Sequence, residues 1–141
     1  MSELKDRITK ELSQIQLASL ATLTESGLPW TRYVMVQGDV DLMIRCATFL
    51  GARKVAQIKS NPEVHITCGI TNPMQMKAYL QVQGRAEIVV DEAERHAFWN
   101  PSLADIFSGA DDPDYAVVVI KPYRIEYCTP PSMEAEVLEL G

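Results

Sequence analysis

Apolar residues along this chain follow two different periods. The first of them are spaced by three or four positions: Leu4, Ile8, Leu12 and Ile15. This spacing predicts an amphipathic helix over residues 3–16. Beyond it the period shortens to about two, which is typical of strands with one buried face. The alternation predicts strands over residues 17–24, 29–37, 42–47, 64–68, 77–90 and 115–127.

Turn formers and caps mark where these elements end. Ser26-Gly27 predicts the tight turn of a hairpin. Pro62 is expected to end a short helix, because the residue before a proline disfavours the helical conformation. Asp91 offers a side-chain cap to the next helix. Together these signals predict helices over residues 52–60 and 92–99, a helical turn over 103–107, and turns over 39–41 and 111–114.

Strands joined by such short turns favour an antiparallel sheet that closes or nearly closes on itself. The run from Ala116 to Ile120 is apolar on both faces, so the last strand should lie centrally. Gly84 suggests a bulge or bend. We therefore expect one domain over residues 1–141, mainly β, with a six-stranded antiparallel split barrel and short flanking helices. Residues 129–141 are expected to leave the core.

Composition and charge exclude several classes of protein. The 141 residues fit a single domain, and the net charge of −6 disfavours general nucleic-acid binding, which needs a basic face. No apolar run approaches the roughly 18 residues that span a bilayer. The charged N-terminus lacks the apolar stretch of a secretion signal, so we expect a cytoplasmic protein.

Neither cysteines nor histidines point to a metal or a disulfide framework. The three cysteines are far apart in sequence. His65 and Cys68 are three positions apart on an expected strand, which places them on opposite faces. His96 follows Glu92 by one helical turn, as a solvated pair would. We expect no metal site, and the glycine motifs of P-loop and Rossmann nucleotide sites are missing as well.

Two cations lie at an unusual place in the helix expected over residues 52–60. Val55 and Ile58 give this helix its apolar edge, and Arg53 and Lys54 then fall in its first turn. Carboxylates are favoured at that end because the helix dipole is positive there. A bound phosphate would resolve the conflict, since free N–H groups, a guanidinium and an ammonium all bind anions. The alternative is two solvated surface cations.

Several stretches of the chain form a recognisable set through their order and spacing. They are Arg32-Tyr33-Val34-Met35-Val36, Ala47-Thr48, Ala52-Arg53-Lys54-Val55, Asn61-Pro62, Gly84-Arg85-Ala86-Glu87, Phe98-Trp99, Phe107 to Tyr115 and Pro122 to Tyr127. Together they resemble the pyridoxamine 5′-phosphate oxidase-like split-barrel family and its general-stress-protein branch. The resemblance extends over about residues 5–128. It implies a six-stranded split barrel that forms a homodimer, with FMN bound at the subunit interface.

The resemblance also implies roles for individual residues. Arg53 and Lys54 would hold the FMN phosphate, and Thr48 would add a hydroxyl. Arg32 would approach the phosphate or the ribityl chain. The remaining implied contacts are with the flavin ring: backbone groups of Val34 and Met35, Tyr79, and Trp99 from the partner, although Trp99 is equally well explained as a core or interface anchor.

The chain departs from true pyridoxamine 5′-phosphate oxidases where these grip the substrate. It has Gln37 where they carry a lysine, and its last strand ends in Cys128 followed by Thr129-Pro130-Pro131 instead of a tryptophan strand and an Arg-x-His segment. We therefore expect an FMN-dependent oxidoreductase of another small molecule. The alternatives are a non-catalytic flavin-binding stress or carrier protein, and a cleft that binds a deazaflavin or haem. No catalytic side chain stands out.

Overall fold

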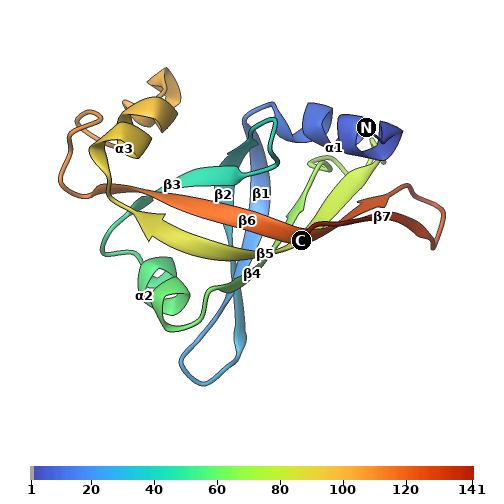
Figure 1. Ribbon diagram of the computed structural model, residues 1–141, viewed down its shortest axis with the longest axis horizontal. Helices are drawn as coiled ribbons and strands as arrows, with labels where there is room; N and C mark the ends of the chain where they lie inside the picture. Colours follow the sequence, from blue (N-terminus) through green and yellow to red (C-terminus); the bar gives the residue numbers. More distant parts are fainter. Residues whose placement is uncertain (1) are drawn as a thin grey trace.

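The alternating segments form an antiparallel barrel in the computed structural model, which describes residues 2–141 (Figure 1). The helices are α1 (Glu3–Leu12), α2 (Arg53–Ser60) and α3 (Glu92–Phe98), followed by a 3-10 turn at Pro101–Leu103. The strands are β1 (Gln16–Leu23), β2 (Pro29–Gly38), β3 (Ile44–Phe49), β4 (Glu63–Cys68), β5 (Tyr79–Val89), β6 (Tyr115–Cys128) and β7 (Ala135–Glu139).

The strand order β3-β2-β1-β4-β5-β6 closes into a barrel because β3 also pairs with β6. Inward residues of all six strands form one core, and Ile8 and Leu12 of α1 close one end of it. β6 has strand partners on both edges, which confirms its predicted central place. The six-stranded split barrel expected from the sequence is therefore confirmed.

The barrel is incomplete between β2 and β3. These strands pair only at Gln37↔Arg45 and Gly38↔Ile44. The edge of β2 from Trp30 to Val36 consequently has no strand beside it on that side among residues 2–141. Backbone groups on an unpaired edge are available to other partners. This opening is the split in the barrel, and it positions the candidate site.

The predicted bulge in β5 is confirmed. The register with β6 shifts between Gln83 and Gly84. A Cβ atom at position 84 would lie 2.9 Å from the carbonyl oxygen of Lys121 and 3.2 Å from Cα of Pro122. Only glycine allows the two backbones to approach this closely.

Several predicted boundaries were wrong by a few residues; β5, for example, begins at Tyr79 and not at residue 77. α1 ends at Leu12 and not at residue 16, because β1 begins at Gln16; Ile15 is therefore in the connection, where it is 41% exposed. β3 begins at Ile44 and not at residue 42, because the Asp39 carboxylate accepts hydrogen bonds from the N–H groups of Asp41 and Met43 and so extends the turn. The helical turn expected over residues 103–107 is confirmed by hydrogen bonds from the N–H groups of Ile106 and Phe107 to the carbonyl oxygen of Leu103, and the 3-10 turn at Pro101–Leu103 precedes it.

The expectation for residues 129–141 was also wrong. They return as β7, which pairs with β6 from Arg124↔Glu139 to Cys128↔Ala135. Leu138 and Leu140 pack against the main core. The physical reason is that β6 is longer than β3 and leaves an edge that a further strand covers. In Figure 1 this strand extends from the barrel on the side opposite α3.

Candidate functional site

The first turn of α2 presents unsatisfied backbone donors. Its N-cap residue, Ala52, has no side-chain cap, and the first turn contains no acidic residue. The amide N–H groups of Arg53 and Lys54 have no acceptor within residues 2–141. These free donors and the positive end of the dipole make an anion-binding position.

Lys54 reaches from this turn toward the end of β3. Its Nζ donates to the Thr48 hydroxyl at 3.0 Å, and Thr48 is only 2% exposed. Burial holds the pKa of Lys54 below its ordinary value, and the nearby charge of Arg32 lowers it further. No carboxylate within residues 2–141 forms an ion pair with this half-buried ammonium. Such a cation is stabilised when an anion binds beside it.

Arg53 takes a different position on the same turn. It is exposed, and its guanidinium carbon lies 5.1 Å from the centre of the Trp30 ring on β2. Stacking on an aromatic face leaves the edge of the guanidinium free to donate hydrogen bonds. Trp30 was not singled out in the sequence analysis, because a contact between residues 23 positions apart leaves no local pattern.

Arg32 lies under the same helix but does not line the cavity described below. Its guanidinium donates to the Thr22 hydroxyl at 2.7 Å, to the Gln57 side-chain oxygen at 2.9 Å, and to the carbonyl oxygens of Leu20 and Trp30 at 3.2 Å. Burial lowers the pKa of Arg32, as does the charge of Arg53. Its donors are therefore largely engaged by the protein itself.

A cavity of about 470 Å³ opens beside the side chain of Lys54, at the split between β2 and β3. It brings together four of the predicted residues: Val34, Met35, Thr48 and Lys54. Most of the remaining lining is apolar, with Phe49 from β3 and Leu17 from β1. Tyr33 and Lys54 are its only titratable residues within the described chain. A slot with apolar walls and the cation of Lys54 at one end fits a planar ring that carries a phosphate.

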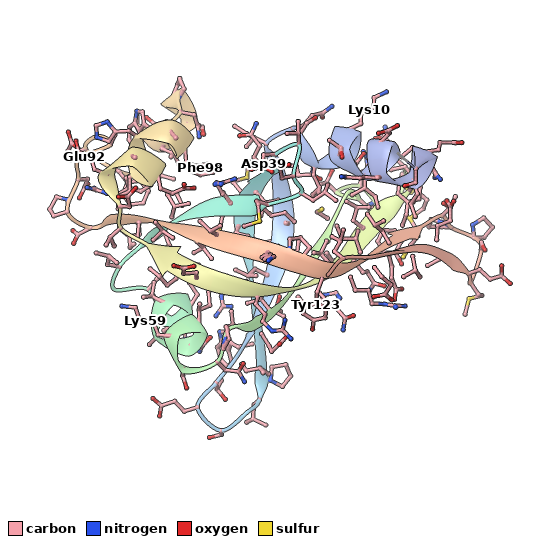
Figure 2. The ribbon with its side chains drawn as sticks, viewed as in Figure 1. Lys10, Asp39, Lys59, Glu92, Phe98 and Tyr123 are labelled. Atoms are coloured by element: carbon pink, nitrogen blue, oxygen red, sulfur yellow. The ribbon has the colours of Figure 1, made fainter. Side chains whose placement is uncertain are left out.

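The segment after α3 covers one side of this cavity. Phe98 lies at the end of α3, on the side toward β3 (Figure 2). With Asn100, Ser102, Leu103, Ile106 and Phe107 it completes the lining. Trp99 is not part of the lining; its ring packs edge-on against Tyr115 with 5.6 Å between centroids. In this chain Trp99 therefore anchors the covering segment to β6.

Tyr79 lies in a second cavity, of about 590 Å³. This cavity is bounded by β1, β2 and the loop over residues 69–78, and it is lined by apolar groups such as Met76. Leu17 and Tyr33 line both cavities, so they form the ridge that separates them. Within one chain, Tyr79 and Lys54 therefore face different cavities.

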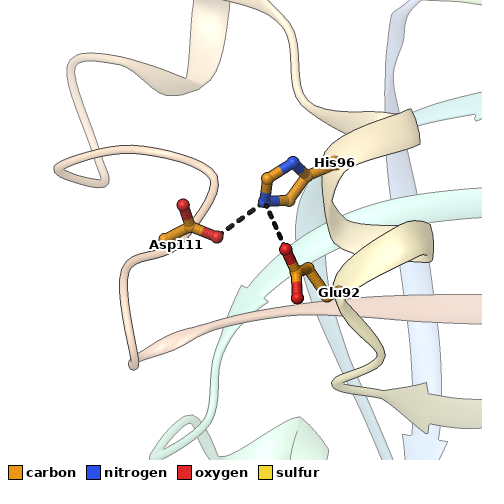
Figure 3. A group of neighbouring side chains, drawn as sticks. All are labelled: Glu92, His96 and Asp111. Atoms are coloured by element: carbon orange, nitrogen blue, oxygen red, sulfur yellow. Dashed lines mark hydrogen bonds and ion pairs between the residues drawn. The ribbon is translucent and has the colours of Figure 1, made fainter.

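A third group of polar side chains lies on the surface near α3 (Figure 3). Nε2 of His96 is 2.6 Å from Oδ1 of Asp111 and 4.0 Å from Oε1 of Glu92, and all three residues are exposed. The predicted solvated pair of Glu92 and His96 is confirmed. Asp111 joins it from the turn that follows the covering segment, a contact that sequence spacing could not reveal. None of the three lines either cavity.

Comparison with known proteins agrees with this fold. A family model described as pyridoxamine 5′-phosphate oxidase matches residues 4–129. The chain therefore belongs to the pyridoxamine 5′-phosphate oxidase family. Within the family it is similar to general stress protein 26 of Bacillus subtilis (strain 168), with 31% identity over 137 residues that cover 94% of this chain and 96% of that protein.

Solved structures give the same picture. The crystal structure of general stress protein 26 from Bacillus anthracis str. Sterne matches with a TM-score of 0.84 at 28% identity, and covers 99% of this chain and 100% of that one. An F420 reductase matches with a TM-score of 0.64 at 27% identity, over 82% and 93% of the two chains. No helix within residues 2–141 is long and apolar enough to cross a membrane.

Proposed function

We propose that this protein binds FMN in the 470 Å³ cavity and acts as an oxidoreductase on a small organic molecule. The observation that carries the proposal is the half-buried Lys54, which has no carboxylate partner within residues 2–141 and lies beside the free N–H groups of α2. Lys54, Arg53 and Thr48 would hold the phosphate. The unpaired edge of β2 at Val34 and Met35 would receive the ring.

The polar residues that line the cavity favour FMN over a haem or a deazaflavin. A haem needs an axial ligand, and the described lining offers no histidine or cysteine for that role, only the phenol of Tyr33 and the thioether of Met35. A deazaflavin with a longer phosphodiester tail would have to extend beyond the turn of α2. The similarity to an F420 reductase keeps that ligand as the second candidate.

We further propose that two copies of the chain form the complete site. Leu17, Tyr33 and Met35 lie on the outer face of β1 and β2 and are 42%, 76% and 50% exposed. An exposed apolar patch of this kind is typical of a subunit interface, and a two-fold contact is the commonest arrangement. Such an axis through the Tyr33 ridge would place the Tyr79 cavity of one copy against the Lys54 cavity of the other.

The chemistry would come from the flavin, which supplies electron transfer when it is bound. The described lining contains no carboxylate, imidazole or thiol that could act as a general acid or base. The residues of this chain would bind and orient the cofactor and keep water from its ring. The same lining, without a carboxylate, imidazole or thiol, also supports the alternative of a flavin-binding protein that does not turn over a substrate.

A titration tests the proposal and separates the alternatives. FMN added to the purified protein should bind with a quenched flavin fluorescence, and F420 and haemin should bind more weakly in competition. Anaerobic addition of NADH or NADPH then distinguishes a redox enzyme, in which the bound flavin is reduced, from a carrier, in which it stays oxidised. No binding of FMN at micromolar concentrations would refute the proposal.

A further inference from the structure

The hydrogen-bond acceptors around Arg32 have one property in common: all of them are neutral. They are the Thr22 hydroxyl, the Gln57 amide oxygen and the carbonyl oxygens of Leu20 and Trp30. Three other half-buried guanidinium groups are paired with carboxylates: Arg7 with Glu136, Arg45 with Asp39 and Glu94, and Arg124 with Glu139. A fourth, Arg95, donates only to backbone carbonyl oxygens, so Arg32 is distinguished by its side-chain acceptors, the hydroxyl of Thr22 and the amide oxygen of Gln57.

Gln57 is the residue at which a carboxylate would fit. Its side-chain oxygen accepts a hydrogen bond from Arg32 at 2.9 Å and another from the Thr22 hydroxyl. Glutamate has the same shape and would accept both bonds, with a stronger, charge-assisted bond to Arg32. A glutamate at this position would therefore serve the fold at least as well as the glutamine does.

A glutamate at position 57 would change the net charge around Arg32, Arg53 and Lys54. Arg32 is close enough to both other cations for their charges to interact: the charge of Arg53 lowers the pKa of Arg32, and the charge of Arg32 lowers the pKa of Lys54. A carboxylate at position 57 would cancel one of these three positive charges. The amide satisfies the donors of Arg32 and leaves its charge uncompensated.

We propose that Gln57 is a specificity-determining residue that keeps the charge of Arg32 available to a phosphorylated ligand. In this arrangement Arg32 attracts the phosphate through its field, while Arg53, Lys54 and the amides of α2 make the contacts. Gln57 also ties α2 to β1 and β2 through Thr22 and Arg32. The inference rests on the proposed function, since it names the class of ligand that the same site selects.

The decisive variant is Gln57→Glu. We expect FMN to bind at least about tenfold more weakly, because one opposing charge is added close to the phosphate. Riboflavin, which has no phosphate, should bind as it does to the wild type. The melting temperature should be unchanged or higher. Gln14→Glu is the matched control, because it adds the same charge at an exposed position outside both cavities; it should leave the ratio of the two affinities unchanged.

A second variant separates charge from geometry. Gln57→Met removes the acceptor and adds no charge, so it should lower the melting temperature and leave the ratio of FMN to riboflavin affinity near that of the wild type. If Gln57→Met lowers the ratio as much as Gln57→Glu does, the effect comes from geometry and the inference is wrong. It is equally wrong if Gln57→Glu leaves the ratio unchanged.

Titration with inorganic phosphate keeps this inference distinct from the proposed function. If the wild type binds no FMN, the proposed function fails, and calorimetry with phosphate then decides the role of Gln57. Weaker phosphate binding by Gln57→Glu than by the wild type supports the inference. Equal binding, or no binding by either protein, overturns it.

Discussion

At the scale of single residues, the candidate site is a set of cations that have no carboxylate partner within residues 2–141. Lys54 is held against Thr48, Arg53 against the ring of Trp30, and Arg32 against neutral oxygens. Each cation is held by a different group, which keeps the three like charges close together despite their mutual repulsion. The free N–H groups at the start of α2 add to the same field.

The first prediction concerns the two cations of that turn. Replacing both, as Arg53→Ala/Lys54→Ala, should weaken FMN binding at least about a hundredfold, since each charge-assisted contact contributes roughly 1.5–3 kcal/mol. Riboflavin binding should hardly change. Fluorescence titration with both flavins measures the difference, and Lys59→Ala, at the exposed far end of α2, is the control. An equal loss for the two ligands would remove the phosphate role.

At the scale of elements, the segments outside the six barrel strands complete the cavity and close one end of the barrel. The covering segment between α3 and β6 completes the cavity through Phe98, Leu103 and Phe107. It is fixed by aromatic packing, with 5.0 Å between the ring centroids of Phe107 and Tyr115. At the opposite end of the barrel, β7 is fixed to α1 by paired hydrogen bonds of 2.8 Å from Arg7 to Glu136.

The attachment of β7 should depend on pH. The hydrogen bonds from Arg7 hold the pKa of Glu136 below its ordinary value of about 4.5. A lowered pKa in the folded state means that the contact stabilises β7 above about pH 4.5, and that this is lost as the pH falls through the lowered value. Hydrogen exchange of the amides of Ala135–Glu139 should therefore accelerate, relative to the barrel strands, in that acidic range.

Two variants check the assignment to Glu136. Glu136→Gln should show weaker protection of β7 at neutral pH and a smaller change on acidification. Glu134→Gln, which alters an exposed carboxylate in the same segment, should behave as the wild type does. If both variants retain the full acidic response, another group controls the attachment of β7.

At the scale of the whole molecule, the two cavities on either side of the Tyr33 ridge are the central feature. One is lined by Lys54 and the unpaired edge of β2, and the other by Tyr79 and Met76. Neither cavity alone contains both Lys54 and Tyr79, which the family resemblance implies as flavin contacts. A second copy related by a two-fold axis would bring Tyr79 of one chain to the Lys54 cavity of the other, which makes the oligomeric state a functional question.

We accordingly predict a homodimer in solution. Light scattering should give twice the chain mass of 15.7 kDa. Tyr33→Asp, which places a charge on the ridge, should shift the protein toward monomer and weaken FMN binding together with dimerisation. Val40→Asp changes a residue that is similarly exposed, 75%, but lies outside both cavities, so it should leave the mass unchanged. A wild-type mass near 15.7 kDa would disprove the composite site.

The last prediction is that pyridoxamine 5′-phosphate is a poor substrate. Gln37 donates its side-chain hydrogen bond to the carbonyl oxygen of Ser13 at 2.9 Å, and the chain after Cys128 turns back into β7. Without a cationic clamp, a loss of about 4 kcal/mol in transition-state binding would lower kcat/KM roughly a thousandfold. Oxygen uptake with FMN-saturated protein measures this. A turnover of about one per second, ordinary for an enzyme, would contradict it.

The sequence by itself determined whatever depends on local pattern. Alternating apolar residues gave the six barrel strands, Asn61-Pro62 gave the end of α2, and Gly84 gave the bulge. The placement of Arg53 and Lys54 at the start of α2 followed as well, because caps and dipoles act within one turn. Each of these features leaves a local signal in the sequence, although the reason for Gly84 is its close approach to the distant Lys121.

The tertiary structure decided whatever depends on contacts between distant segments. It placed Trp99 against Tyr115, Tyr79 in a second cavity and Arg32 among neutral acceptors. It also returned residues 135–139 to the sheet as β7, because β6 extends beyond β3 and leaves an edge to be covered. Such contacts are selected by burial and by the pairing of polar groups across the fold, and neither leaves a periodic signal in the sequence.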